Sequence, residues 1–465
     1  MAITKKNKID FTEGPLFWRL LLFALPIMAT GLLQMLYNAA DKMVVGQFSG
    51  DPYALGAIGS TTFISGLIIN FMAGLGSGAG IIVSQLFGAR READTSRAVH
   101  TSIIMATGIA AVMSVVAFST AKPLLLLLGT REEFMSRALL YLNIIYGGIL
   151  ASALYNTASA ILRATGDSKT PLIIGAASGL INVLLNLFFV IVCKMSVEGV
   201  AIATIISQYF SAVGAIYILS RKRGECYRFS FSKLKCDRLL LKRIIRLGIP
   251  TGLQSTCFSI TNMITTSAVN SFSPAHITAH SVSANIDGML DVISGSFMHS
   301  SMNAAGQNYG AMKPKRIKRV FWFGMAQAFV IMNVVAWTLR FFRADLSAIF
   351  VSTTDPEFDL IVKYTAEWTG TMLATYFLQG LMNVAIGTVR GLGYSISPLI
   401  FNIFGTCITR IVWVFVIFPL EPFNSFSGLA MLYPVSWTAA TLALCILIMI
   451  AFRRLTKKPS RHGMA

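Results

Sequence analysis

The chain carries a stripe of polar residues inside its first long apolar segment. Its members are spaced i, i+3, i+4 and i+7, so a helix places them on one face: Gln34, Tyr37, Asn38 and Asp41. An ionisable residue in a membrane-spanning segment is costly and usually faces a cavity or a partner. A carboxylate beside amides can hold a proton, a sodium ion or the amine of a substrate. We therefore favour a functional role for Asp41 over a purely structural helix contact.

Amide residues on two further apolar segments are candidates for the same site. Asn182 and Asn186 lie four residues apart, and Asn156 lies near the end of an earlier segment. Their amides could bind a coupling ion or a substrate beside Asp41. Buried asparagine also commonly joins helices within membranes. For these three residues a binding role and a structural role both stay open.

The second half of the chain holds a different set of charged residues. Asp287 and Asp291 are four residues apart on one predicted span, and Arg410 lies within another. These charges could form an internal ion pair, or they could line part of a substrate path. Glu367, the remaining acid within a predicted span, lies early in that span beside Trp368, and we expect it at the outer interface.

Metal and nucleotide chemistry find no support in the sequence. The six cysteines show no paired spacing and the five histidines are scattered. We therefore expect neither a disulfide framework nor a metal site, apart from sodium at Asp41. No phosphate-binding loop, catalytic-serine elbow or zinc-protease motif occurs. We expect no cofactor beyond a coupling ion, no enzyme activity and no ATP-driven pump.

The composition is typical of a membrane protein. Of the 465 residues, 55% are apolar and 13% are charged, against roughly 25% charged in soluble domains. The apolar residues come in runs of about 20, which is the length that crosses a bilayer. The net charge of +19 could suggest nucleic acid, but the basic residues concentrate in alternate connections between the runs. That pattern follows the positive-inside rule, and we expect no nucleic-acid partner.

We predict an all-α polytopic membrane protein with twelve transmembrane helices. The predicted spans of the first half lie near 16–44, 53–84, 98–121, 136–161, 171–193 and 200–220. Those of the second half lie near 245–270, 277–305, 319–342, 360–386, 396–420 and 427–452. The predicted organisation is an N-terminal lobe (1–220), a basic linker (221–244) and a C-terminal lobe (245–465).

The two halves of the chain repeat one another. Residues of the same type recur 222 to 227 positions apart, among them the pairs Pro26 and Pro250, Gln85 and Gln307, Asn156 and Asn383, and Arg163 and Arg390. Six spans per copy give both copies the same orientation in the membrane. We therefore predict two six-helix lobes related by a pseudo-two-fold axis along the membrane normal. Asp41 has no acidic counterpart, because Thr265 stands at the matching position.

The basic residues predict the orientation of the spans. If the spans alternate, 30 of the 39 Lys and Arg lie on one side of the membrane, together with both termini and the linker. We expect that side to be cytoplasmic and the protein to lie in the cell membrane. Gly88 and Gly310 end matching stretches on this side. We expect them to allow tight turns, because glycine tolerates backbone conformations that larger residues resist.

Several stretches of the chain resemble the multidrug and toxic compound extrusion (MATE) transporters. They are LPIMATGLLQMLYNAADKMVVGQFSG in the first span, SQLFGAR at Ser84–Arg90, NTASAILRATGDSKTP at Asn156–Pro171 and INVLLNLFFV at Ile181–Val190. The resemblance covers nearly the whole chain, because the second half repeats the first. It implies two six-helix lobes around a V-shaped cavity. It also implies efflux of amphipathic, cationic organic compounds in exchange for inward H⁺ or Na⁺.

The resemblance also implies roles for single residues. It matches Asp41 to the family's first-helix carboxylate, which is implicated in ion coupling and substrate release, and it groups Asn156 and Asn182 with that carboxylate. Many members carry a second carboxylate on the fifth helix, where this chain has Asn186. In another branch the coupling carboxylates lie on the seventh and tenth helices. The tenth-helix position here falls near Gln379, and the seventh helix has no acid.

Two other functions are alternatives to a secondary active antiporter that works by alternating access. A flippase for lipid-linked oligosaccharides would share the fold but should line its cavity with several basic residues, and only Arg410 lies well inside a span. A receptor or membrane-embedded enzyme would need a soluble domain or a cluster of His, Asp and Glu within the spans. We expect a monomer in membrane lipid that binds a small organic molecule. The sequence leaves open which substrate is carried, whether H⁺ or Na⁺ is coupled, and on which side the cavity opens.

Overall fold

The chain is helical wherever the structure describes it. The computed structural model describes residues 8–342, 345–346 and 356–457, and across these ranges it contains helices and no β-strand. The two ends of the chain, which were predicted to be cytoplasmic, lie outside these ranges, in residues 1–7 and 458–465. The prediction of an all-α protein is confirmed.

The helices form two compact units. The first unit contains the residues up to Asp10 and Leu25–Ser255, and the second contains Phe11–Ala24 and Thr256–Ala465. The connector after the sixth span and the start of the seventh span therefore belong to the first unit. The lobe boundaries at 220 and 245 and the pseudo-two-fold axis stay predictions.

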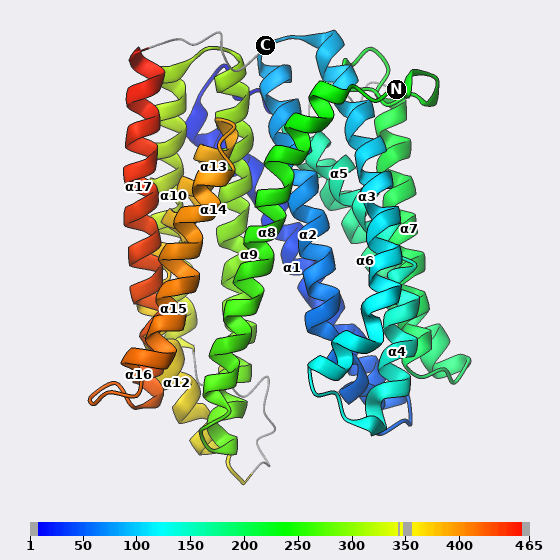
Figure 1. Ribbon diagram of the computed structural model, residues 1–465, viewed down its shortest axis with the longest axis vertical. Helices are drawn as coiled ribbons and strands as arrows, with labels where there is room; N and C mark the ends of the chain where they lie inside the picture. The colour runs from blue at the N-terminus through cyan, green and yellow to red at the C-terminus, as the bar shows by residue number, and fades with distance from the viewer. Residues whose placement is uncertain (1–7, 343–344, 347–355, 458–465) are drawn as a thin grey trace. The chain divides into compact units, whose positions relative to one another are not determined.

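The first unit is a bundle of long helices (Figure 1). It contains the greater part of α1 (Leu16–Phe48) and the start of α8 (Arg238–Val269). Its other helices are α2 (Ala54–Gly88), α3 (Glu92–Leu127), α4 (Glu132–Tyr146), α5 (Ile149–Ala164), α6 (Lys169–Leu187) and α7 (Val197–Arg221). A π-helical turn extends α6 over Phe188–Val192, and a short 3₁₀ turn, Phe231–Lys233, interrupts the connector 222–237 between α7 and α8.

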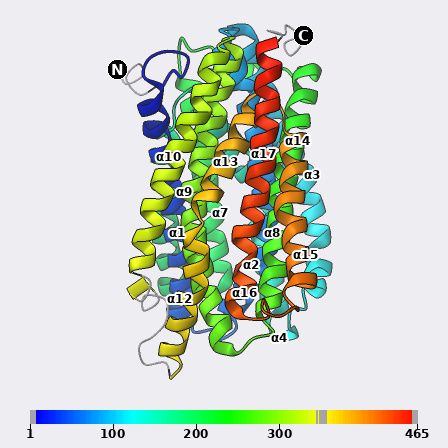
Figure 2. The same ribbon diagram turned by 90° about the vertical axis from the view of Figure 1, so that its left-hand side faces the viewer.

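The second unit is also a helix bundle, in which α17 packs along α13 and along the rod that α14 and α15 form (Figure 2). It contains the start of α1 and the end of α8. Its other helices are α9 (Pro274–Gly310), α10 (Pro314–Phe341), α12 (Phe358–Ala374), α13 (Phe377–Gly391), α14 (Ile396–Asn402), α15 (Thr409–Val412), α16 (Phe426–Ala430) and α17 (Leu432–Lys457). A π-helical turn, Ile403–Ile408, joins α14 and α15 into a continuous rod, and a second, Trp413–Ile417, extends the rod beyond α15.

Most of these helices are suited to cross a bilayer. Eight of the described helices are long and apolar enough, and ten spans result if α4 with α5 and α12 with α13 each count as one bent span. The other two long helices are less apolar, because α8 begins with a basic stretch and α9 carries Asp287, Asp291 and many serines. With α8 and α9 added, the described part of the chain has twelve long helices or bent helix pairs, one for each predicted span.

The two halves repeat the same local features. The bend between α4 and α5 is 46°, and the bend between α12 and α13 is 45°. After α5 and after α13 the chain turns through a glycine with left-handed backbone, Gly166 (φ 89°) and Gly393 (φ 90°). Only glycine takes such angles without strain. These matches support the duplication that the residue spacing indicates.

The turns after α2 and α9 are not made as predicted. Gly88 and Gly310 are the last residues of their helices, and both are buried. The left-handed backbone falls two residues later, on Arg90 (φ 55°) and Met312 (φ 57°). Tight turns therefore follow both helices, but the two glycines do not supply the unusual backbone conformation for which they were predicted, because each is still part of its helix.

Alternate glycines on α2 bring two neighbouring helices into backbone contact. A Cβ atom added to Gly74 would lie 2.3 Å from the backbone of Gly252 in α8, and one added to Gly78 would lie 2.6 Å from that of Gly248. The intervening glycines, 76 and 80, face the backbone of α5 in the same way. Small residues four positions apart commonly permit such close helix contacts in membranes. The sequence analysis missed this role, although the stretch MAGLGSGAG displays it.

The connection between α1 and α2 is held by Asp51. Its carboxylate accepts hydrogen bonds from Arg137 Nε (2.5 Å), Ser196 Oγ (3.1 Å) and the backbone N of Tyr53 (3.0 Å). Burial would raise the pKa of the Asp51 carboxyl, but these hydrogen bonds and the Arg137 charge outweigh burial and hold that pKa below its ordinary value. Asp51 therefore ties the connection to α4 and to the start of α7.

Gly78→Ala should destabilise the protein, because its methyl group would overlap the Gly248 backbone and force α8 away. Overpacking of this kind costs about 1–3 kcal/mol. Gly66→Ala is the matched control on the same helix, since nothing lies within 4 Å of its added Cβ. There the change should be neutral or should stabilise by up to about 1 kcal/mol. Thermal unfolding in detergent compares the two variants, and equal stability would show that α2 and α8 are not in tight contact.

Asp51→Asn should lower the stability at neutral pH by up to about 1 kcal/mol, since water screens part of the interaction with Arg137. A folded-state pKa below the unfolded value contributes stability above the unfolded pKa, and that stability is lost as the pH falls through the folded pKa. The difference between Asp51→Asn and the parent protein should therefore vanish in acid. Unfolding temperatures measured from neutral pH to about pH 3 test this. A difference that persists in acid would contradict it.

Candidate functional site

The carboxylate of Asp41 on α1 is bound by Asn186 on α6. Asn186 Nδ2 donates a hydrogen bond to Asp41 Oδ1 and lies 3.4 Å from Asn182 Oδ1. Asn186 is fully buried, and its own Oδ1 has no hydrogen-bond partner within the described ranges. The structure thus brings together three of the residues that the sequence singled out, and it leaves one buried amide oxygen beside them.

The polar stripe of α1 faces α6. The Tyr37 hydroxyl donates to the backbone O of Ala176 (3.2 Å), and its ring covers Gly179 so closely that a Cβ there would overlap it. Gln34 and Asn38 lie on the same stripe and are exposed, and they form no hydrogen bond with other described residues. These two side chains are therefore available to a ligand, whereas Tyr37 is held by α6.

Asn156 forms its hydrogen bonds within its own helix. Its Nδ2 donates to Ser152 O (2.9 Å) and lies 3.3 Å from Ser152 Oγ. Its grouping with Asp41 stays a prediction. Tyr141 of α4, which the sequence analysis did not name, lies within electrostatic range of Asp41. No spacing pattern marks Tyr141, because it reaches Asp41 from a different helix.

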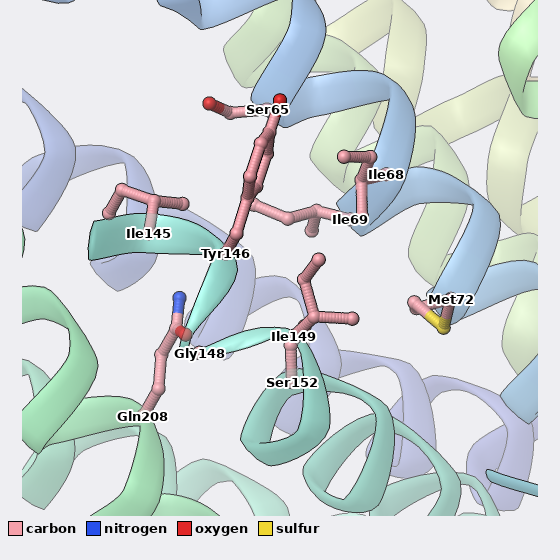
Figure 3. A pocket seen from close by; sticks show the side chains of 10 residues that line it. All are labelled: Ser65, Ile68, Ile69, Met72, Ile145, Tyr146, Gly148, Ile149, Ser152 and Gln208. Carbon is pink, nitrogen blue, oxygen red and sulfur yellow. The ribbon is translucent and has the colours of Figure 1, made fainter. Parts of the chain in front are cut away.

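A small cavity lies at the break between α4 and α5 (Figure 3). It encloses about 310 Å³, part of it open to solvent, and is lined by Ser65, Ile68, Ile69, Met72, Ile145, Tyr146, Gly148, Ile149, Ser152 and Gln208. The Tyr146 ring reaches toward Ser65, and neither hydroxyl has a hydrogen-bond partner among the described residues. The cavity is mostly apolar and holds no ionisable acid or base.

In the second unit, polar residues of α9 pair in order with residues around the bend between α12 and α13. We call this set the polar ladder. Its three hydrogen bonds run from Tyr376 Oη to Asp287 Oδ1 (2.6 Å), from Gln379 Nε2 to Asp291 Oδ1 (2.9 Å) and from Asn383 Nδ2 to Ser294 Oγ (2.7 Å). Asp287 is half-buried, whereas Asp291 is exposed. The structure therefore unites the predicted candidates Asp287, Asp291 and Gln379.

Arg410 supplies positive charge near the polar ladder without an ion pair. Its side chain is 1% exposed, and its NH1 donates to Asn262 Oδ1 (2.8 Å) and its Nε to Ser436 Oγ (3.2 Å). The guanidinium lies 4.6 Å from the ring centre of Tyr433, a favourable cation–π contact. It is close enough to Asp287 and Asp291 to interact with their charges.

The direct ion pair that the sequence left open is not formed, since no described acid lies within 4 Å of the Arg410 nitrogens. The Arg410 guanidinium instead donates hydrogen bonds to an amide and a hydroxyl and lies over an aromatic ring. Arg410 therefore acts on the acids of the polar ladder over a longer distance, as a buried counter-charge.

The cavity and the polar ladder occupy matching places in the two halves of the sequence. The offset of 222 that relates Gln85 to Gln307 also relates Ser65 to Asp287 and Ile69 to Asp291. The offset of 227 relates Ser152 to Gln379 and Asn156 to Asn383. The second copy thus carries two acids where the first copy carries a serine and an isoleucine. The two copies have diverged in their chemistry.

Sequence analysis missed the partners that complete the second cluster, namely Tyr376, Tyr433 and Asn262. One signal for Tyr376 was present, because Tyr376 and Gln379 lie one helical turn apart, as do Asp287 and Asp291. Two such pairs on neighbouring parallel helices can hydrogen-bond to one another in order, as Tyr376 does with Asp287 and Gln379 with Asp291. The repeat relates Asn262 to Asn38 at an offset of 224, but nothing in the spacing identified Asn262 or Tyr433 as a partner of Arg410.

The donor set at Asp41 suits a proton or a hard cation. It consists of a carboxylate and amide oxygens, which are the ligands that hard cations prefer. Within the described ranges no group of three or more His, Cys, Asp or Glu side chains could hold a metal ion. A transition-metal site therefore has no candidate there, whereas one carboxylate with a spare amide oxygen fits H⁺ or Na⁺.

Comparison with known proteins gives a consistent result. The MatE family profile matches residues 26–188 and 250–416. The probable multidrug resistance protein YpnP of Bacillus subtilis is 29% identical over 403 residues, covering 86% of this chain and 88% of its own. The FAD transporter of Shewanella oneidensis is 21% identical over 405 residues, covering 86% and 87%. An outward-facing multidrug resistance MATE family transporter of the MOP superfamily has the same fold, with a TM-score of 0.90 at 20% identity over 98% of this chain and 100% of that one.

Arg410→Gln should destabilise the protein by about 1–3 kcal/mol, because it removes the hydrogen bonds to Asn262 and Ser436 and the positive charge near the acids of the polar ladder. Adding Asp287→Asn to that variant should recover part of the loss, since it removes one of the uncompensated charges. Chemical or thermal unfolding in detergent measures this double-mutant cycle. The exposed residue Arg319, changed to Gln, is the control for loss of a positive charge. Additive effects of Arg410→Gln and Asp287→Asn would show that the two residues are not coupled.

Proposed function

The chain belongs to the MATE family of transporters, and from that membership we propose that it exports amphipathic organic cations in exchange for H⁺ or Na⁺. It is a multi-pass membrane protein, and its relatives are transporters rather than enzymes. The side of the membrane on which its ends lie follows from the basic residues alone, and we propose that this side is the cytoplasm.

The observation that carries the proposal is the contact between Asp41 and Asn186. Asp41 is the only acid in the predicted spans of the first half, and it is bound by a buried amide. A charged group at this depth is costly unless it has a partner. A cation bound at Asp41 neutralises its charge and so changes the free energy of burying it. Ion binding there can therefore favour one conformation of the transporter over another. Coupling requires such a difference in affinity between two conformations.

Both coupling ions fit the same atoms, but they exclude one another. A proton would bind to a carboxylate oxygen of Asp41. Na⁺ would take the charged carboxylate together with Asn186 Oδ1, the buried amide oxygen that no described group engages. Because Asn186 replaces the second carboxylate common in the family, the site binds one cation charge at a time. Imposing the two gradients separately distinguishes the two modes of coupling.

Asp291 is our candidate for contact with the substrate. Its carboxylate is exposed and is fixed at one oxygen by Gln379. Arg410 offsets one of the two negative charges of Asp287 and Asp291, which leaves one for the amine of an organic cation. The chain also contains 21 methionines and 32 phenylalanines. Such side chains give the adaptable apolar surface that a broad substrate range requires.

An anionic substrate is disfavoured by the same geometry. A lipid pyrophosphate, or a dinucleotide such as the one named for the Shewanella relative, needs accessible basic groups. Arg410 is the basic residue of the second-unit cluster, and it is 1% exposed, with its Nε and NH1 bound by Ser436 and Asn262, so it is closed off from an anion. The flippase alternative therefore lacks the positively charged lining that it requires.

Asp41→Asn should abolish gradient-driven export while leaving the protein folded. The amide has the size of the carboxylate and can still accept a hydrogen bond from Asn186, but it cannot exchange a proton or balance the charge of Na⁺. Transport of a fluorescent organic cation into inverted vesicles, with pH and Na⁺ gradients imposed separately, measures the loss. A decrease of at least about tenfold is expected, as for loss of a group worth 1.4 kcal/mol or more.

Asp291→Asn is the matched comparison, because it also removes one carboxylate from a span. It should weaken the apparent affinity for the cation and leave the coupling to the gradient in place. Undiminished gradient-driven export by Asp41→Asn would remove Asp41 from the coupling mechanism. Equal loss of coupling in both variants would shift the assignment to the second unit.

A further inference from the structure

The connector 222–237 is fixed to the first unit. Tyr227 and Phe229 are buried, and Phe229 stacks on His100 of α3 with ring centres 5.4 Å apart. His100 Nε2 accepts a hydrogen bond from the backbone N of Ser230 (3.1 Å). Two buried aromatic rings and a buried imidazole thus give the connector a defined position and a defined outer side.

Three acids in and around the connector are paired with basic residues of the same unit: Glu225 with Lys8, Asp167 with Lys222, and Asp237 with Arg97. Asp237 also accepts hydrogen bonds from the backbone N of Leu239 (3.0 Å) and of Leu240 (3.1 Å), which caps the start of α8. These three acids are therefore not available to offset the remaining basic side chains of the connector.

The exposed residues from the end of the connector into the start of α8 are basic and apolar. We call them the basic face, which consists of Phe231, Lys233, Leu234, Lys235, Arg238 and Leu239. Phe231 and Leu239 are each 75% exposed, and Leu234 is 42% exposed. The three basic residues form no ion pair with any residue that the structure describes. Because α7 is a candidate membrane span and ends at Arg221, the connector starts at the membrane surface.

We propose that the basic face binds the anionic lipid headgroups of the adjacent leaflet. Lys233, Lys235 and Arg238 pair with phosphate groups, while Phe231 and Leu234 insert beneath them. Basic side chains near a membrane surface are attracted to anionic lipids, and exposed aromatic and aliphatic side chains anchor a segment in the interface. A nucleic acid would use the charges but would gain nothing from exposed leucines. The combination of both kinds of side chain therefore favours lipid.

Cys236 provides a probe within the basic face. It is exposed and unpaired, and replacing the other five cysteines by alanine leaves a single attachment point for a polarity-sensitive fluorophore. The labelled full-length protein is reconstituted in vesicles of phosphatidylcholine alone or with phosphatidylglycerol added. We expect the emission to shift to the blue in the anionic vesicles and to shift back at high salt, which screens exposed charges.

Three variants assign the effect to its residues. The triple change Lys233→Gln, Lys235→Gln and Arg238→Gln should abolish the shift. Phe231→Ser with Leu234→Ser should reduce the shift and leave it sensitive to salt. Lys233→Arg with Lys235→Arg should retain it, which separates loss of charge from loss of folding.

The matched control removes the same charge elsewhere. Lys315→Gln, Arg319→Gln and Arg454→Gln take away three exposed basic residues outside the connector and should leave the shift unchanged. Equal emission in both kinds of vesicle, or a shift that survives in the triple variant of the basic face, would overturn the proposal. So would a blue shift produced by single-stranded RNA, and not by phosphatidylglycerol, with the protein in phosphatidylcholine vesicles.

Discussion

Inside a bilayer there is no water to hydrogen-bond a polar group, so every buried polar group must find its partner in the protein. That constraint explains why the described chain is helical, since a helix satisfies its own backbone. It also explains what happens where a helix breaks. At the bend between α4 and α5 the carbonyl of Gly147 accepts a hydrogen bond from Tyr209 Oη (3.0 Å). At the bend between α12 and α13, Tyr376 turns its hydroxyl to Asp287 (2.6 Å).

The same constraint shapes the two polar clusters differently. In the first unit a single carboxylate depends on one amide, and the oxygen of that amide has no partner among the described residues. In the second unit two carboxylates and a guanidinium each hydrogen-bond to partners of their own, among tyrosine, amide and serine side chains, which makes a denser cluster. A sparse cluster responds strongly to one added cation, because few other groups can adjust to it. A dense network keeps its geometry when a ligand arrives.

The sequence predicted much of this organisation. Apolar runs gave the spans, and matched spacing gave the repeat, because both are local properties of the chain. Asp41 stood out as the one acid in the apolar spans of the first half. The position of Gln379 followed from the resemblance to the MATE family. The choice of partners could not be predicted: Arg410 finds Asn262 and Tyr433 through tertiary packing, which no spacing encodes. The turns after α2 and α9 were misplaced because a buried glycine can serve helix packing as well as chain reversal.

The two halves of the chain differ in the residues that they carry at matching positions. The positions that became Asp287 and Asp291 in one half are Ser65 and Ile69 in the other, and each set fits its own neighbours. In the second half Tyr376 and Gln379 hydrogen-bond to the two acids, and Arg410 lies near them. In the first half the corresponding positions carry no acid, and the acid of the predicted spans, Asp41, lies on α1 beside α6.

Four glycines at alternate positions make residues 74–80 of α2 a weak stretch of helix in its own right. Each glycine costs about 1 kcal/mol of helical stability relative to alanine. The stretch stays helical because α5 and α8 press directly on its backbone. Its amide protons should therefore report on those neighbours: hydrogen exchange in this stretch would accelerate whenever α8 moves off α2, well before any other part of the helix opened.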